Sequence, residues 1–290
     1  MQNVKIVTDS NSGITQAEAE KLGISVVPMP FLIDGETYFE DINLTQEEFY
    51  AHLKEDANVS TSQPAIGDLT DLWDRLLEDE DAQIVHIPMS SGLSESCHTA
   101  QALARDYGGR VHVVDNQRIS ITQKESVRDA LLLASRGCSA AEIKNYLETT
   151  ARESSIYITL ETLKYLKKGG RLTPAAALIG TLLRIKPVLQ IQGAKLDAFR
   201  KVTSVKAAKK VMIDAVRSDA ETRFAALREK GELELAIAHT ANAEEAAVFA
   251  EELRQAFPDI PLRDVDPLSL SVACHIGPGA LACGLTHILK

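Results

Sequence analysis

Three short polar segments combine hydroxyl side chains and glycine in a way that could hold an anion. They are TDSNSG (8–13), STSQP (60–64) and SSGLSES (90–96), and each lies between an apolar run and a predicted helix. Hydroxyls and backbone N–H groups supply the hydrogen bonds that a charged group needs once it leaves water. Each segment alone is also typical of ordinary turns, because Ser, Asn, Asp and Gly dominate turns. Together the three segments favour a site for one anionic group.

The second segment has two interpretations. Pro64 suits the first turn of a helix, and Leu69, Trp73 and Leu76 then repeat at helical spacing. The simpler interpretation is that a hydroxyl ahead of Pro64 caps this helix. The other is an anion cradle, because a helix N-terminus offers N–H donors and the positive end of the helix dipole.

A histidine in ACHIGPGALACG (273–284) is the remaining candidate. The GPG at 277–279 predicts a tight turn that presents His275 from a fixed backbone, ahead of a final helix. A histidine held in this way could donate a hydrogen bond to an anion. Its neighbour Cys274 resembles a catalytic partner only in sequence, because adjacent side chains generally point in different directions.

The elements that would position these residues alternate in the first half of the chain. VKIVTDS (4–10), QIVHIPM (83–89) and RVHVVDN (110–116) are β-branched apolar runs with helical patterns between them. This alternation predicts a parallel sheet covered by helices on both faces. Ligands of such sheets bind outside the carboxyl ends of the strands, which is where the polar segments fall.

Local signals predict further elements of this half. TQAEAEKLG (15–23) is typical of a helix with its final glycine just past the end, and the prolines of 24–33 indicate an edge or a bend. The DG at 34–35 predicts a hairpin, and Thr45 with Glu48 predicts a capping box.

The second half mixes hairpins with helices. We expect a strand at 154–160, a hairpin around Gly193, a long helical stretch over about 204–230, and then strand, helix, strand and a final helix. The predicted fold class is therefore α/β, with an N-terminal α/β domain over 1–152 and a C-terminal α+β domain with a mixed or antiparallel sheet over 153–290.

Composition excludes several classes of function. The 290 residues are 45% hydrophobic, and their net charge of −10 argues against nucleic acid and anionic membranes as partners. No apolar run approaches the roughly 20 residues of a membrane span, and the N-terminus enters a strand pattern directly. The four cysteines form no CxxC pair and have no histidine at zinc-finger spacing. We expect a cytoplasmic protein without a metal or another cofactor.

Six motifs occur in an order and spacing that resemble the DegV family along nearly the whole chain. They are VTDSNSG, TSQP, SSGLS, YLKKGGR, IKPVL followed by a glycine-turn hairpin, and HIGPGALACG. The resemblance implies a non-catalytic two-domain protein that encloses a long-chain fatty acid, such as palmitate, stearate or oleate, between its domains. It further implies that the protein presents the fatty acid to a separate fatty-acid kinase, which makes acyl phosphate for phospholipid synthesis.

The resemblance also assigns roles to residues of the polar segments. Thr61, Ser62 and Ser94 match the hydroxyls around the carboxylate, Ser91 is a further candidate, and His275 looks like the histidine that completes the site. Two more residues, Asp9 and Ser10, are implied to orient these groups rather than touch the ligand.

Other matches concern the acyl chain and the kinase. The resemblance implies that four small apolar residues line the acyl chain of the fatty acid: Ala176, Leu178, Ile179 and Leu182. Docking is implied for two basic residues, Arg171 and Arg200. The chain departs from the family pattern at 117–126, near the pocket wall, and at Thr203, where relatives often carry arginine.

Alternatives to a carrier remain open. A hydrolase or transferase could use one serine with His275 and Asp9, although the chain has no G-x-S-x-G, P-loop or HExxH motif. A kinase subunit for a polyol would need a small polar pocket, which the apolar segment 172–191 does not favour. A regulatory lipid sensor has the same sequence features as a carrier.

Overall fold

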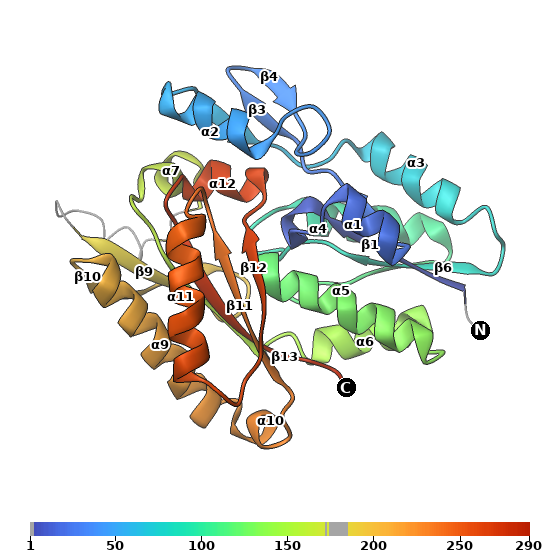
Figure 1. Cartoon of the computed structure of the whole chain (residues 1–290). Helices are drawn as coiled ribbons and strands as arrows, with labels where there is room; N and C mark the ends of the chain where they lie inside the picture. The colour runs from blue at the N-terminus through green and yellow to red at the C-terminus, as the bar shows by residue number, and fades with distance from the viewer. Residues whose placement is uncertain (1–2, 172, 174–184) are drawn as a thin grey trace. The chain divides into compact units, whose positions relative to one another are not determined.

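The computed structural model describes residues 3–171, 173 and 185–290. The chain divides into two compact units, Met1–Arg152 and Glu153–Lys290, and each unit has its own sheet and helices (Figure 1).

Unit 1 is built on a four-stranded parallel sheet with the order β2-β1-β6-β7. A separate antiparallel sheet has the order β4-β3-β5. The strands are β1 (Asn3–Asp9), β2 (Ser25–Val27), β3 (Phe31–Ile33), β4 (Glu36–Tyr38), β5 (Val59–Thr61), β6 (Ala82–Ile87) and β7 (Val111–Val113). The helices are η1 (Ser10–Ser12), α1 (Gln16–Leu22), α2 (Gln46–Lys54), α3 (Ile66–Leu76), α4 (Ser96–Leu103), η2 (Ala104–Tyr107), α5 (Ser120–Ser135) and α6 (Ala140–Thr149).

Helices cover both faces of the parallel sheet, as the alternation of strands and helices predicts. One face packs against α5 and α6, with Val127 and Ile143 in the core, and the other against α3 and α4, with Trp73 and Cys97 fully buried. Strands buried on both faces read as near-continuous apolar runs, which explains why the sequence shows them clearly.

Several local predictions for unit 1 are confirmed. Helix α1 ends at Gly23, whose φ of 68° lies in the left-handed region that glycine tolerates. Thr45 and Glu48 form the capping box of α2. The DG at 34–35 joins β3 and β4 as a hairpin, and the prolines of 24–33 separate the edge strand β2 from β3.

Unit 2 has one mixed sheet with the order β10-β9-β8-β13-β11-β12, antiparallel except for β11 with β12. The strands are β8 (Ser154–Thr159), β9 (Lys186–Ile191), β10 (Leu196–Val202), β11 (Leu233–His239), β12 (Leu262–Pro267) and β13 (Leu281–His287). The helices are α7 (Lys164–Lys168), α9 (Val205–Glu221), α10 (Ala225–Glu229), α11 (Ala243–Ala256) and α12 (Leu270–Ile276).

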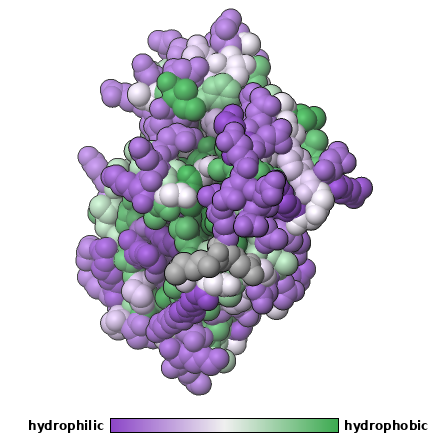
Figure 2. All heavy atoms as spheres, turned by 90° about the vertical axis from the view of Figure 1, so that its right-hand side faces the viewer, coloured by the Kyte–Doolittle hydropathy of each residue, from purple (hydrophilic) through white to green (hydrophobic). Residues whose placement is uncertain are grey.

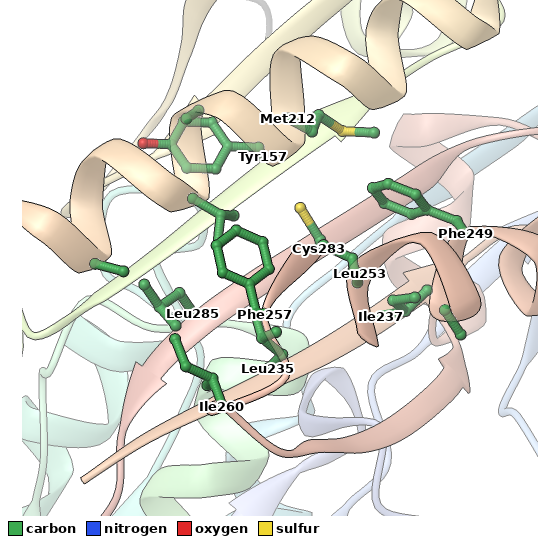
Figure 3. Packing of buried hydrophobic residues seen from close by; sticks show 14 of the residues in the cluster. Tyr157, Met212, Leu235, Ile237, Phe249, Leu253, Phe257, Ile260, Cys283 and Leu285 are labelled. Carbon is green, nitrogen blue, oxygen red and sulfur yellow. The ribbon is translucent and has the colours of Figure 1, made fainter. Parts of the chain in front are cut away.

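The core of unit 2 lies between this sheet and the helices α9 and α11. Met212 of α9 and Phe249 of α11 pack with Cys283 of β13 and Tyr157 of β8 (Figure 3). The mixed sheet confirms the predicted α+β character of this half.

One prediction for unit 2 is wrong. The segment after the GPG turn forms β13 rather than a final helix, because this strand lies between β8 and β11 and is buried on both faces. Short buried strands and buried helices share the same apolar pattern. The helical stretch expected over 204–230 consists of two helices, α9 and α10, and the first ends at Thr222, whose φ of −123° and ψ of −77° are not helical.

No helix of the described residues is long and apolar enough to cross a membrane. On the face drawn in Figure 2, hydrophilic residues predominate and apolar residues show in patches between them.

Candidate functional site

Asp9 ends β1, and its carboxylate joins three segments of unit 1. It accepts hydrogen bonds from the backbone N–H of Asn11 at 3.0 Å, from the backbone N–H of Met89 at 2.8 Å and from Nε2 of Gln123 at 3.2 Å. Only 2% of Asp9 is exposed, and this burial raises the pKa of its carboxyl to about 6, although the hydrogen bonds oppose the rise. Asp9 therefore ties the end of β1 to the loop after β6 and to α5.

Ser10 also contacts protein groups. Its hydroxyl accepts a hydrogen bond from the backbone N–H of Met29 at 3.0 Å, in the connection between β2 and β3. The hydroxyl of Ser12 donates to the carbonyl of Asp9 at 2.8 Å. These contacts hold the first polar segment against its neighbours.

The loop after β6 carries Ser91 and Ser94, and both are half-buried. The backbone N–H of Ser91 donates to Oδ1 of Asp115 at 3.3 Å, and that of Ser94 donates to the carbonyl of Ser90 at 3.2 Å. The hydroxyl of Ser94 accepts from the backbone N–H of Ser96 at 3.2 Å, at the first turn of α4. The third polar segment thus forms a compact turn with a fixed backbone.

Thr61 and Ser62 do not cap a helix, so the simpler interpretation of their segment is wrong. Helix α3 begins at Ile66, its N-cap residue is Ala65, and no side chain caps it. Thr61 instead ends β5, opposite Phe31 of β3. The predicted hydroxyl pair is therefore placed by a strand end, and Pro64 lies ahead of the helix rather than in its first turn.

A hydrogen bond joins the second polar segment to helix α4, which follows the third polar segment. Oγ1 of Thr99 in α4 donates to Oε1 of Gln63 at 2.9 Å. Because Gln63 follows Ser62 directly and Ser94 lies just before α4, this bond brings the two predicted hydroxyl segments to one side of unit 1.

Gln63 and Thr99 line a small pocket with about 20 Å³ of space, enough for one water molecule. Among the described residues, two buried polar atoms of its lining have no hydrogen-bond partner: Nδ1 of His86 and Oγ of Ser96. Burial lowers the pKa of His86 to about 3, so its imidazole is neutral at pH 7. The polar residues that line the pocket are Asp9, Gln63, His86, Ser96 and Thr99.

Of the predicted site residues that the structure describes, only Asp9 lines this pocket. Sequence reasoning missed Gln63, Ser96 and Thr99, although the first two lie inside the quoted polar segments. It also missed Gln123, which lies on the inner side of α5 in the segment that departs from the family pattern.

His275 belongs to unit 2 and lies on α12, one residue before its end, so it precedes the turn rather than a final helix. The turn is anchored to the residue after β11: Oγ1 of Thr240 donates to the carbonyl of Gly277 at 2.6 Å, and the backbone N–H of Ala280 donates to Oγ1 of Thr240 at 2.9 Å. Burial and the positive charge of Arg171 lower the pKa of His275 to about 4. The imidazole is therefore neutral at pH 7 and carries one N–H donor.

The two basic docking candidates are exposed. Nη1 of Arg171 donates to the carbonyl of Gly169 at 2.6 Å, just past α7. Arg200 lies on β10 at the edge of the sheet, and Thr203 follows that strand. The predicted acyl-chain residues Ala176, Leu178, Ile179 and Leu182 lie outside the described residues.

No group of three or more His, Cys, Asp or Glu within residues 3–171, 173 and 185–290 could hold a metal ion.

Comparison with known proteins supplies a context for these residues. A family model described as "Uncharacterised protein, DegV family" matches residues 3–287. Protein DegV of Bacillus subtilis is 30% identical over 96% of this chain and 97% of its own. A DegV domain-containing protein of Deinococcus radiodurans is 30% identical over 98% of each chain.

Solved structures are similar over almost the whole chain. A fatty-acid-binding DegV family protein from Thermus thermophilus has a TM-score of 0.88 at 27% identity, over 99% of this chain and 100% of its own. DegV from B. subtilis, also described as a fatty-acid-binding protein, has a TM-score of 0.85 at 28% identity with the same coverage.

Proposed function

The chain belongs to the DegV family, and we propose that it binds one long-chain fatty acid and is not itself a catalyst. The observation that carries this proposal is the similarity, over 99% of the chain, to the fatty-acid-binding proteins of T. thermophilus and B. subtilis.

We propose that the carboxylate of the fatty acid is held by Thr61, Ser62, Ser94 and His275, with Ser91 as a further donor. Three observations support this assignment. Thr61 and Ser62 are not used to cap α3, Ser94 lies in a rigid turn, and His275 is neutral at pH 7. A neutral imidazole donates a hydrogen bond to an anion without first taking up a proton.

The acyl tail would supply most of the affinity. Burial of one CH₂ group contributes roughly 0.8 kcal/mol, so ten buried groups contribute about 8 kcal/mol before the costs of binding. Micromolar affinity corresponds to about −8.2 kcal/mol. A chain of palmitate or oleate length could therefore bind tightly while the hydroxyls and the imidazole fix its orientation.

We further infer that the protein presents the carboxylate to a separate fatty-acid kinase, with Arg171 and Arg200 on the docking surface. Both arginines are exposed, which docking requires. The expected reaction is phosphorylation of bound oleate when the kinase and ATP are added, detected by trapping the acyl phosphate with hydroxylamine. Equal conversion of bound and free oleate would contradict the presenting role.

The carboxylate assignment is tested by comparing oleate with methyl oleate. Thr61→Val keeps the shape of the side chain and removes the hydroxyl. Loss of a hydrogen bond to a charged group costs about 1.5–3 kcal/mol, so oleate affinity should fall about 10- to 150-fold. Methyl oleate has an uncharged ester that accepts only a weaker hydrogen bond, so its affinity should fall less.

The exposed neighbour Ser60 lies on the same strand, and Ser60→Ala is the matched control with unchanged affinity. The assignment is wrong if Thr61→Val, Ser62→Ala and His275→Ala all bind oleate as the wild type does.

A further inference from the structure

Two adjacent glycines, Gly169 and Gly170, follow α7, and each position requires glycine for a different structural reason. Gly170 has a φ of 70°, and a side chain there would meet no atom within 4 Å, so its backbone conformation requires glycine. Gly169 has a φ of −79° and a ψ of −2°, which alanine adopts without strain. The reason for glycine at 169 must therefore be the space around it.

That space is filled by the imidazole of His275. A methyl group on the Cα of Gly169 would lie 2.0 Å from Nδ1 and 2.7 Å from Cε1 of this ring. Both distances are far below the 3.4 Å or more of ordinary contacts. The ring can keep its position only while residue 169 has no side chain.

A second glycine allows a close approach between the same two segments. A methyl group on Gly277, the residue that ends α12, would lie 2.2 Å from Cδ2 of Tyr165 in α7. Helix α7 and helix α12 therefore pack closely through one glycine of each segment. Because Gly277 is also bound by Thr240, the backbone that carries His275 has little freedom to retreat.

We propose that Gly169 is a positioning residue for His275. Because residue 169 has no side chain, the imidazole has room for the orientation in which it meets the carboxylate of the ligand. The expected effect on ligand binding rests on the proposed function, whereas the contact between Gly169 and His275 does not. The carbonyl of Gly169 also accepts a hydrogen bond from Arg171, the cation whose charge helps to lower the pKa of His275, so the same residue holds both groups.

The variant that tests the inference is Gly169→Ala. The added methyl must turn the ring away from its site, and the environment that now lowers the pKa of His275 to about 4 is then lost. We expect the NMR titration of this imidazole, assigned with His275→Ala, to move toward its ordinary value of 6.5. Oleate affinity should fall at least tenfold. Gly67→Ala in α3, where a side chain would meet nothing within 4 Å, is the matched control.

A double variant keeps the test valid if Gly169→Ala folds poorly. Removal of the ring in His275→Ala also removes the clash, so Gly169→Ala should lower the thermal midpoint by several degrees only when His275 is present. An equal loss in both backgrounds would overturn the inference, because the methyl would then clash with something else.

The two readouts separate this inference from the proposed function. A shifted imidazole pKa with unchanged oleate affinity upholds the positioning of His275 and rejects its role at the carboxylate. Reduced affinity with an unchanged pKa overturns the inference, as does no change in either. If the wild type binds no fatty acid, the proposed function fails and the titration and the double variant still decide the contact.

Discussion

Asp9 provides a quantitative test of how unit 1 holds its polar loops. Burial raises the pKa of this carboxyl from 3.8 to about 6 against the effect of hydrogen bonds from Met89, Gln123 and Asn11. The difference of about 2.2 pKa units corresponds to about 3 kcal/mol. The ionised form of Asp9 therefore costs the folded state stability at pH 7.

The sign of the pH dependence follows from this shift. The folded protein binds a proton at Asp9 more tightly than the unfolded chain does, so this contribution stabilises the fold as the pH falls. Asp9→Asn removes the titration. Between pH 7 and pH 5 the wild type should gain about 1 kcal/mol of unfolding free energy relative to the variant, with the full gain of about 3 kcal/mol reached below pH 3.8.

Trp73 makes the assay specific for unit 1. It is the only tryptophan of the chain and is fully buried in the core between the sheet and α3. Urea unfolding followed by its fluorescence, at several pH values, gives the difference between the wild type and Asp9→Asn. If the wild type instead loses stability relative to the variant as the pH falls, the donors outweigh burial and the reasoning is refuted.

Three further predictions follow from other residues. His86→Leu should remove a pH effect of the opposite sign. Because burial lowers the pKa of the imidazole to about 3, the wild type should lose about 2 kcal/mol of unfolding free energy relative to the variant between pH 7 and pH 5. Equal pH profiles of unfolding, followed by Trp73 fluorescence, would contradict this. Asp219→Ala should destabilise unit 2 by about 3 kcal/mol, because its buried carboxylate accepts a hydrogen bond from Tyr157 at 2.7 Å; unchanged hydrogen exchange of β8 would count against this. Thr45→Ala should cost about 1 kcal/mol through loss of the α2 cap, whereas Thr45→Ser should cost less; equal thermal midpoints for the two variants would reject the cap as the cause.

Local signals in the sequence predict much of the fold. Gly23 and the Thr45–Glu48 pair act within a few residues of their own helices, so their effects are visible without tertiary information. The alternation of apolar runs with helical patterns likewise predicts the parallel sheet, because each run becomes a strand covered on both faces.

Tertiary packing explains where the structure departs from the local pattern. Residues 281–287 look like a helix because a central strand is apolar on both faces, and the sheet that surrounds β13 decides its conformation. At Thr222 the helical pattern continues, but the chain turns so that Phe224 enters the core of unit 2.

In the candidate site, too, local features can be predicted from the sequence and tertiary contacts cannot. The polar segments are found by composition, whereas the partners of their side chains come from distant elements. Gln123 reaches Asp9 from α5, and Thr99 reaches Gln63 across 36 positions of sequence. No local pattern connects such pairs, and the steric role of Gly169 beside His275 is equally invisible in sequence.

The most direct test of the central claim is the content of the purified protein. The protein is denatured and extracted with organic solvent, and the extract is analysed by mass spectrometry. We expect about one long-chain fatty acid per chain, and displacement of that lipid by added palmitate or oleate. An extract without fatty acid, together with no binding of either added lipid, would contradict the claim.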